Sequence, residues 1–213
     1  NKNQYKYLDR VITPDRVADP SKLSEKEQQN GIPNSKKKTW VPIEKGFTSS
    51  DLYYKTQTEY INWSKESLEQ IQEHPNGILK NIEYYFQPGV FNSIGGFANL
   101  QARFTDNRVV DHTGNIFVPV SSEIISVKYL VGILNSPIPS YVTKNFINST
   151  GMETSDLRAI PIPIPTEKQE TKIESLVEDA IGSQKGENSQ SIEAIQEKIN
   201  DAVTEVYQVE LNE

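Results

Sequence analysis

Short strand-like segments that alternate with turn residues dominate the middle of this chain, between residues 40 and 120. These segments contain aromatic and β-branched residues, which favour strands, and glycine, proline or asparagine follows within a few positions. They are Trp40–Phe47, Glu59–Trp63, Tyr84–Phe86, Leu100–Phe104, Arg108–Val110 and Ile116–Val120. Strands that are this short and closely spaced predict an irregular, twisted β-sheet domain and not a doubly wound fold.

Turn and capping residues predict how these strands are connected. Thr105-Asp106-Asn107 has the composition of a β-hairpin turn between two of the strands. A short helix is expected at Ser24–Gln29. A second helix is expected to begin after Ser64, which suits the N-cap position, and to end at His74. A third helix begins at Ser126 and ends at Asn135-Ser136-Pro137, and a long excursion to Ile160 follows.

The last third of the chain contains an extended arm and two amphipathic helices. Ile160-Pro161-Ile162-Pro163-Ile164-Pro165 predicts the arm, with its isoleucines facing inward, because alternating prolines cannot donate ladder hydrogen bonds. Thr166 and Gln169 match a capping box. Apolar residues then recur at helical spacing over 167–181 and 192–207. We expect these two helices to form a hairpin or to pack against a partner.

The charge of the chain is divided unevenly. Its formal net charge is −7, from 22 basic and 29 acidic residues. Residues 166–213 hold 12 acidic and 4 basic side chains, a net of −8, so residues 1–165 carry a net of +1. The acidity therefore belongs to the C-terminal segment and does not exclude a nucleic-acid partner for the rest. Because the rest has no overall positive field, any contact with a polyanion must be local.

These signals together predict an α+β fold: an irregular twisted β-sheet domain with short helices, followed by C-terminal amphipathic helices. A length of 213 residues with 35% hydrophobic residues is sufficient for a real core. We expect residues 1–39 to be a polar N-terminal segment that joins an upstream part, 40–165 the β-rich domain and 166–213 the acidic helices. The chain begins at Asn1 and its one methionine is Met152, so we expect a piece of a longer protein.

Residues suited to catalysis or metal binding are scarce. The chain has no cysteines and two histidines, His74 and His112, both beside turn residues. A metal site requires three or four suitable ligands, and neither a glycine-rich phosphate loop nor a nucleophile elbow occurs. No apolar run approaches the ~18 residues of a membrane span, and no signal-peptide pattern opens the chain. We expect a cytoplasmic, non-catalytic chain without a metal site.

Residues 92–108 are rich in turn residues and contain a cluster of polar side chains that can pair with base edges. Arginine, asparagine and glutamine match guanine or adenine edges with two hydrogen bonds. The candidates for base contacts are Asn92, Ser93, Asn99, Gln101, Arg103, Asn107 and Arg108. The candidates for phosphate contacts, which position a protein on DNA, are Lys36, Lys37, Lys38 and Lys45. The alternative for each is an ordinary solvated loop residue, and for Arg103 a structural arginine.

An ordered series of motifs runs from Trp40 to Tyr207. The first half contains Trp40 with Lys45-Gly46, Tyr60-Ile61-Asn62-Trp63, Tyr85-Phe86 with Gly89-Val90 and Ser93, and Ala102-Arg103-Phe104. The second half contains Tyr129-Leu130 with Leu134-Asn135-Ser136, Asp156-Leu157 with Ile160-Pro161-Ile162-Pro163, and Ile199 to Tyr207. This series resembles the TaqI-like C-terminal specificity domain of Type IIG restriction–modification enzymes and adenine-specific DNA methyltransferases. Type I specificity subunits are more distantly similar. The last motif departs from the family pattern at Thr204 and Gln208.

The resemblance implies that residues 40–165 are a target recognition domain that reads base edges in the major groove of double-stranded DNA. A methyltransferase domain in the same parent chain would bind S-adenosylmethionine upstream and flip out the target adenine. The parent would be a restriction–modification or phage-defence (BREX-type) protein, with an added nuclease in some Type IIG members.

Two other functions stay open. One is a protein-interaction module that docks another subunit through the helices at 167–181 and 192–207. The other is a stand-alone hydrolase, for which the sequence offers no plausible set of catalytic residues.

Overall fold

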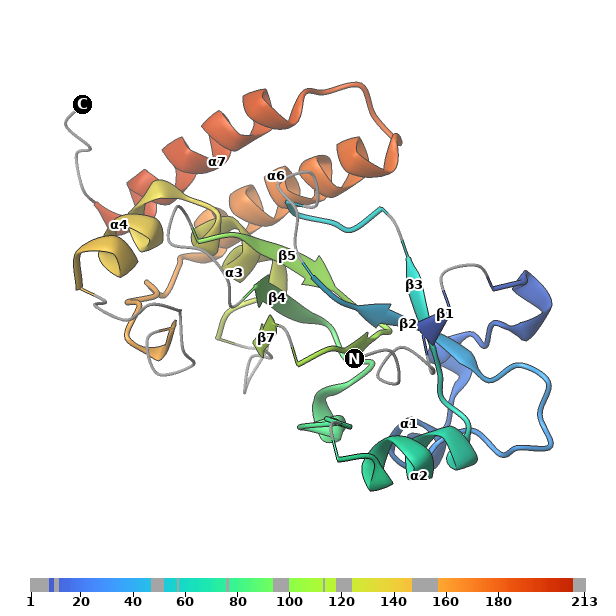
Figure 1. The fold of residues 1–213 in the computed structure, drawn as a ribbon. Coiled ribbons are helices and arrows are strands. Elements are labelled where there is room, and N and C mark those ends of the chain that lie inside the picture. The colour runs from blue at the N-terminus through green and yellow to red at the C-terminus, as the bar shows by residue number, and fades with distance from the viewer. Residues whose placement is uncertain are drawn as a thin grey trace. The chain divides into compact units, whose positions relative to one another are not determined.

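The computed structural model describes residues 8–9, 12–46, 52–56, 58–75, 77–93, 100–112, 114–117, 124–146 and 157–208 (Figure 1). The fold is mixed α+β, as predicted, with two small sheets and short helices followed by two C-terminal helices. The chain divides into two compact units that interleave along the sequence. Unit 1 comprises Asn1–Gly46, Gln57–Pro88 and Thr105–Gly114, and unit 2 comprises Phe47–Thr56, Gly89–Phe104 and Asn115–Glu213. This division runs across the boundaries expected at residues 39/40 and 165/166.

Unit 1 is built on a four-stranded sheet with the strand order β1-β3-β2-β6. The strands are β1 (Leu8–Asp9), β2 (Trp40–Glu44), β3 (Glu59–Asn62) and β6 (Val109–Val110). Strand β3 pairs antiparallel with both β1 and β2, whereas β6 pairs parallel with β2, with Ile43 opposite Val109. The predicted strands that begin at Trp40 and Glu59 are confirmed.

The helices of unit 1 begin where the sequence predicts. Helix α1 (Glu25–Asn30) has a complete capping box, in which Ser24 and Glu27 each accept a hydrogen bond from the other's backbone N–H. Helix α2 (Lys65–Glu73) is capped by Ser64 and ends at His74. Local capping chemistry alone is sufficient to place these helix starts.

The core of unit 1 surrounds Trp63, which is fully buried. Its indole Nε1 donates hydrogen bonds of 3.0 Å to the carbonyl oxygens of Glu27 and Gln28. The rings of Tyr85 and Phe86 lie 5.9 and 5.6 Å from the Trp63 ring, in tilted and edge-on orientations. The prediction of a strand at Tyr84–Phe86 is therefore wrong: a 3₁₀ helix, Ile82–Tyr84, is followed by a turn in which Phe86 has a φ of 63°. This turn brings two successive aromatic side chains onto one tryptophan.

The sheet of unit 2 has the strand order β5-β4-β7. Its strands are β4 (Gly89–Ser93), β5 (Ala102–Thr105) and β7 (Gly114–Phe117). The predicted hairpin across Thr105–Asn107 is wrong, because β5 joins this sheet whereas β6 joins the sheet of unit 1. The turn itself exists, and Asn107 adopts a left-handed φ of 54°. Of the predicted strand at Ile116–Val120, residues 118–120 lie outside the described residues.

The helices of unit 2 are α3 (Val127–Leu134), α4 (Pro137–Phe146), α6 (Glu167–Lys185) and α7 (Ile192–Tyr207). Ser126 caps α3, and Thr166 and Gln169 form the predicted capping box of α6. The long excursion expected after Pro137 contains a helix, because Pro137 is the first residue of α4. At that position proline's missing N–H removes no helix hydrogen bond. Helix α3 has its C-cap at Asn135, so the next helix begins two residues later.

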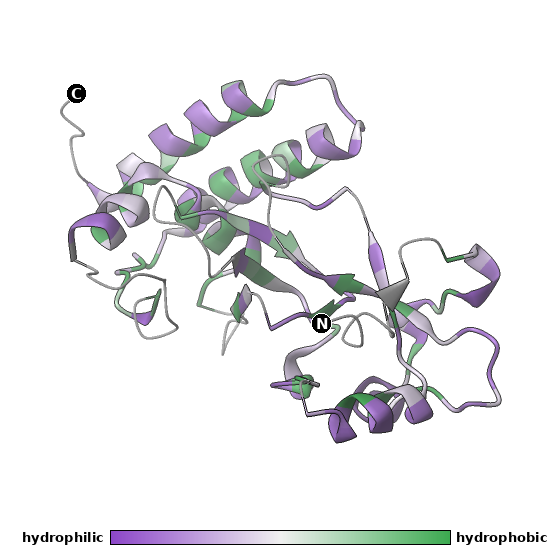
Figure 2. Cartoon of the chain, viewed as in Figure 1, coloured by the Kyte–Doolittle hydropathy of each residue, from purple (hydrophilic) through white to green (hydrophobic). Residues whose placement is uncertain are grey.

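The apolar stripes of α6 and α7 pack against each other and against α3, so the helical hairpin is confirmed. Figure 2 shows hydrophobic colour on the sides of α6 and α7 that face each other and hydrophilic colour on their outer sides. Ile173 and Val177 on α6, and Ile195 and Ile199 on α7, are fully buried. These helices therefore complete the core of unit 2.

Tyrosine hydroxyls fix the proline arm. The hydroxyl of Tyr129 on α3 donates to the carbonyl oxygen of Pro163 at 2.8 Å, and that of Tyr207 on α7 donates to the carbonyl oxygen of Pro161 at 2.7 Å. Burial raises the pKa of Tyr207 to about 12. Ile160 is buried as expected, but Ile164 is 77% exposed, so the prediction that all three isoleucines face inward is wrong.

Candidate nucleic-acid interface

Side chains from three elements hold the backbone of residues 100–102 in unit 2. Asn135, at the C-cap of α3, accepts a 2.7 Å hydrogen bond from the N–H of Ala102 and donates a 2.8 Å bond to its carbonyl oxygen. Ser140 on α4 accepts from the N–H of Leu100 at 3.0 Å. Asn92 on β4 donates to the carbonyl oxygen of Gln101 at 2.6 Å. The backbone that leads into β5 is therefore rigidly held; β5 carries the predicted base contact Arg103, and Gln101 lies just before the strand.

Two of the predicted base-contact residues are buried. Asn92 is 2% exposed and its amide nitrogen is bonded to the backbone, and Arg103 is fully buried with its guanidinium carbon 4.8 Å from the centre of the Phe91 ring. A side chain must leave the protein surface to reach a base edge in a groove. In this conformation neither does, so Asn92 and Arg103 are corrected to structural residues. For Arg103 this was the alternative stated from the sequence.

Gln101, another predicted base-contact residue, is partly exposed as a whole residue. Its backbone carbonyl accepts from Asn92, but its amide has no hydrogen-bond partner within the described part of the chain. Strand alternation places its side chain on the same side of β5 as that of Arg103. Ser93 belongs to β4, but its side chain lies outside the described residues, as does the whole of Asn99.

The other two predicted base contacts lie at the start of β6 in unit 1. The Asn107 amide donates to the neighbouring Asp106 carboxylate at 2.8 Å. Burial raises the pKa of Asp106, and hydrogen bonds from Asn107 oppose that shift. Arg108 lies 3.9 Å from the carboxylate of Glu44, with only 10% of its side chain exposed. Both residues are thus held by acidic neighbours inside their own unit.

Glu44 and Arg108 belong to a cluster of alternating charges between the ends of β2 and β6. Lys45 lies 3.7 Å from Asp111, which is also 3.1 Å from the Nδ1 of His112. Glu44 is 1% exposed, whereas the side chains of Lys45 and His112 are 23% and 35% exposed. Buried charges require partners, and this alternation supplies them. Lys45 and His112 are the more exposed members of the cluster, whereas Arg108 and both carboxylates are largely buried.

The three consecutive lysines lie on an exposed loop of unit 1. Lys36 pairs with Glu27 at 2.5 Å and Lys37 with Asp15 at 2.7 Å, and Lys38 is exposed as well. The hydrogen bond from Lys37 lowers the pKa of Asp15 to about 2. Surface pairs of this kind are weak, so both lysines can exchange their carboxylate partner for a phosphate. This loop and Lys45 carry the four lysines that the sequence predicts as phosphate contacts.

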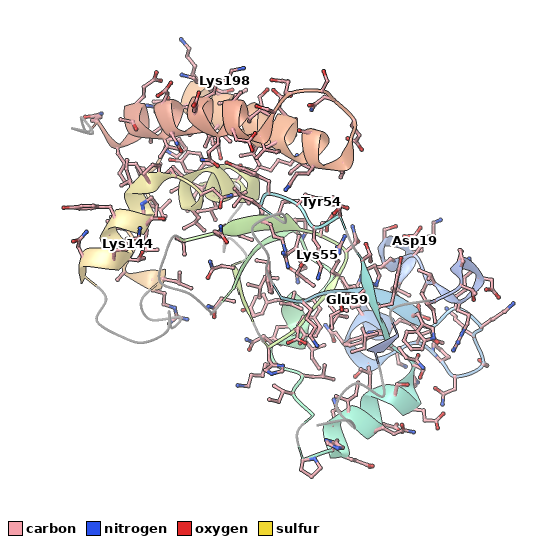
Figure 3. The ribbon with its side chains drawn as sticks, turned by 45° about the horizontal axis from the view of Figure 1, so that its top comes forward. Asp19, Tyr54, Lys55, Glu59, Lys144 and Lys198 are labelled. Carbon is pink, nitrogen blue, oxygen red and sulfur yellow. The ribbon has the colours of Figure 1, made fainter. Side chains whose placement is uncertain are left out.

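The contacts of Asn135 and Ser140 with the strand were not expected from the sequence, which places Asn135 at the end of a helix and Ser140 in the excursion that follows. Asn135 belongs to the Leu134-Asn135-Ser136 motif, and that motif was the available signal. Tyr53 was also missed: it is fully buried, has a φ of 70° and donates a 2.5 Å hydrogen bond to Gln196 on α7. Tyr54 and Lys55 follow it in the same segment (Figure 3). A non-glycine residue with this backbone conformation is uncommon, and no sequence pattern marks it.

The C-terminal helices leave no apolar stripe for docking another subunit. Their stripe residues are buried in the core of unit 2, and polar and charged side chains cover the outer faces, where Lys198 is labelled on α7 (Figure 3). Pairs such as Lys172 with Glu205, 2.9 Å apart, connect the two helices on that surface. The apolar stripes are therefore used inside unit 2. Docking of another subunit through the charged outer faces of these helices stays a prediction.

The described residues contain neither a candidate metal site nor a helix that could span a membrane. Within those residues no group of three or more histidine, aspartate or glutamate side chains is arranged to hold a metal ion. Among the described helices none is long and apolar enough to cross a membrane.

The chain is similar to a known protein in its fold. No protein-family profile matches the chain, and no curated protein matches it in sequence. Among solved structures, the chain is similar to the Type IIL restriction–modification enzyme MmeI in complex with DNA, with a TM-score of 0.50 and 12% sequence identity. The match covers 82% of this chain and 29% of the MmeI chain, so this chain spans less than a third of that protein's length. At this identity the likeness shows a shared fold.

Proposed function

We propose that this chain is a sequence-specific recognition domain for double-stranded DNA in a restriction–modification or phage-defence adenine methyltransferase. The observation that carries the proposal is the fold likeness, over 82% of this chain, to part of a restriction–modification enzyme whose structure is a DNA complex. The ordered motifs between Trp40 and Tyr207 support it independently, because they were identified from the sequence alone.

The described side chains divide into two roles in this proposal. Gln101 is partly exposed as a residue, and we assign its side-chain amide to reading a base edge in the major groove. Lys36, Lys37, Lys38 and Lys45 contact phosphates and set the position of the domain on the duplex. Arg108 and Asn107 stay proposed base contacts, although each must first exchange an acidic neighbour for DNA.

Catalysis is assigned to a separate domain of the parent protein. That domain would bind S-adenosylmethionine and methylate an adenine flipped out of the duplex, while this chain selects the sequence. The outer faces of α6 and α7 carry many carboxylates, which repel DNA phosphates. We therefore place the DNA against other surfaces of the chain.

Selection from a library of randomised duplexes tests the proposal. The 213-residue chain is incubated with the library, and the bound duplexes are sequenced and then titrated individually. We expect enrichment of a defined sequence and an affinity that falls as salt concentration rises, because phosphate contacts release counterions. A bound pool as random as the input, or an affinity independent of salt, would contradict a role in sequence-specific recognition.

A matched pair of triple variants tests the phosphate contacts. Replacing Lys36, Lys37 and Lys38 by alanine should reduce the slope of log affinity against log salt by up to about 0.9 per lost contact, with little effect on sequence preference. The control replaces Lys168, Lys172 and Lys198 on α6 and α7 by alanine and removes the same charge. Equal changes in the salt-dependence slope for both variants would show that the loop with Lys36, Lys37 and Lys38 does not contact phosphates.

A further inference from the structure

A closed ring of polar contacts connects the C-terminal helix to the start of β5 within unit 2. The hydroxyl of Tyr53 donates to the side-chain oxygen of Gln196 at 2.5 Å, and the Gln196 amide nitrogen donates to the backbone oxygen of Asn135 at 3.1 Å. The Asn135 side chain makes both of its hydrogen bonds to the backbone of Ala102. The N–H of Tyr53 then donates to the same Ala102 oxygen at 3.4 Å, which closes the ring. We call these four residues the Tyr53 network.

The Tyr53 network holds a backbone conformation that is unfavourable by itself. Tyr53 has a φ of 70°, a region that costs a bulky residue on the order of 1 kcal/mol or more. Its carbonyl oxygen also accepts a 2.9 Å hydrogen bond from the N–H of Phe104, so Tyr53 contacts β5 on both sides of Arg103. Such conformations persist only where the surroundings determine them, and they concentrate at functional positions.

The Tyr53 network holds the backbone beside Gln101 in place. The carbonyl oxygen of Gln101 is bonded to Asn92, the next residue is bonded to Asn135, and the preceding residue is bonded to Ser140. Its two neighbours in sequence are thus held by backbone hydrogen bonds, while its side-chain amide has no partner among the described residues. A specificity-determining contact requires a side-chain amide with no competing partner on a fixed backbone. The fixed backbone holds the amide in one orientation, so that its hydrogen-bond pattern distinguishes one base from the others.

We propose that Gln101 reads an adenine edge in a DNA duplex, and that the Tyr53 network is the positioning device that orients it; this inference rests on the proposed function. A glutamine amide donates to N7 and accepts from N6 of adenine, a pair of bonds that no other base offers in the same geometry. Gln101 is the specificity-determining residue, and Tyr53, Asn135 and Gln196 are positioning residues that never touch the DNA.

The test compares base preference in single variants after the enriched duplex has been identified. Gln101→Ala should weaken binding of that duplex about 5- to 150-fold and relax the preference at one A·T pair only. Tyr53→Phe, which removes one hydroxyl, should relax the preference at the same pair by about 2- to 30-fold and leave the salt dependence unchanged. In the Gln101→Ala background, Tyr53→Phe should have no further effect on that preference.

Tyr129→Phe is the matched control. Tyr129 is equally buried, and its hydroxyl makes one hydrogen bond, to the Pro163 oxygen of the arm. The two tyrosine variants should lose similar thermal stability, but Tyr129→Phe should keep the wild-type base preference. Hydrogen exchange at the Ala102 amide should be faster in Tyr53→Phe than in Tyr129→Phe.

The outcomes separate this inference from the proposed function. If Gln101→Ala keeps the full base preference, the assignment of Gln101 is wrong even though the domain recognises DNA. If Tyr53→Phe weakens all duplexes equally, with the same effect in the Gln101→Ala background, the network is merely structural. A wild-type chain that shows no base preference overturns the proposed function itself, and the inference with it.

Discussion

At the scale of single residues, burial separates polar groups that the sequence treats alike. Asn92, Gln101 and Arg103 are all polar residues beside turns, and all three suit base contacts by type. The structure bonds Asn92 to a neighbouring strand and buries Arg103 against Phe91, whereas the Gln101 amide stays unengaged among the described residues. Residue type therefore indicates what a side chain can pair with, but accessibility decides whether a groove can be the partner.

Trp63 is predicted to be the most important single side chain for the stability of unit 1. Trp63→Ala removes a fully buried ring that contacts Tyr85 and Phe86 and leaves two backbone carbonyls without their indole donor. We expect the free energy of unfolding to fall by about 3–5 kcal/mol. Urea titration followed by circular dichroism measures this change. Tyr84→Ala, at a residue 44% exposed, is the control and should change stability by less than about 0.5 kcal/mol.

Glu27 should make the stability of α1 depend on pH. The hydrogen bond from Lys36, followed by that from the Ser24 N–H, lowers the pKa of Glu27 below its usual 4.5. The folded state therefore favours the carboxylate, which contributes stability above pH 4.5 and loses it as the pH falls through the lower folded value. Glu27→Gln should cost about 1 kcal/mol at neutral pH, because the cap and ion pair weaken.

The measurement for Glu27 is thermal unfolding of the wild type and the variant across the acidic range. The difference between the two melting temperatures should shrink as the pH falls below 4.5, since protonation removes the advantage of the wild type. Glu25→Gln, in the same helical turn, is the control and should show a smaller difference at neutral pH. A difference that stays constant with pH would assign the loss to packing instead of charge.

At the scale of elements, helix starts were predictable and strand partners were not. Ser24, Ser64, Ser126 and Thr166 each cap a helix that the sequence predicts, because a cap depends on residues three positions away. The hairpin across Thr105–Asn107 was predicted from equally local information, but its two strands belong to different sheets. Strand pairing depends on which distant strand offers a free edge, and β2 offers one to β6.

Gly132 is predicted to permit the close packing of α3 on α6. A Cβ atom there would lie 2.5 Å from Cγ2 of Ile173 and 3.3 Å from Cγ2 of Val177. Gly132→Ala should therefore destabilise unit 2 by about 1–3 kcal/mol, although alanine alone favours a helix by about 1 kcal/mol. Thermal unfolding of this variant and of the control Gly182→Ala measures the difference.

Gly182→Ala tests the same substitution in a buried glycine of α6. There the nearest atom to the added Cβ is the amide nitrogen of Asn188, 2.9 Å away at the end of a side chain that can move. We expect a smaller loss than at Gly132. A Gly132→Ala variant as stable as the wild type would show that α3 and α6 can separate without cost.

At the scale of the whole molecule, unit 2 gathers segments from across the chain. The C-terminal helices bury Ile173, Val177, Ile195 and Ile199 in one cluster with α3, although they carry much of the chain's acidic charge outside. The helices that the sequence marked as a separate acidic segment are thus part of the core that supports β4 and β5. A charge boundary in sequence does not coincide with a packing boundary.

A variant that ends at Pro165 is therefore predicted to lose the structure of unit 2. Truncation removes both helices and exposes α3, and the side chains that remain cannot bury enough apolar surface to replace them. We expect loss of a cooperative thermal transition, increased binding of a hydrophobic dye, and aggregation in light scattering. A monomeric truncated chain with a cooperative transition would instead favour a separable docking segment.

The sequence by itself determined the α+β class, the starts of α1, α2, α3 and α6, the extended proline arm and the amphipathic hairpin, because capping, proline geometry and apolar periodicity act over a few residues. Three features came from the tertiary structure alone. Tyr85 and Phe86 pack on Trp63. Strands β5 and β6 belong to different sheets, and Asn135 binds the backbone of Ala102. The tertiary structure also decided which polar candidates remain accessible. The contacts of Trp63 with Tyr85 and of Ala102 with Asn135 join residues 22 and 33 positions apart in the chain, and no local pattern encodes which distant surfaces will meet.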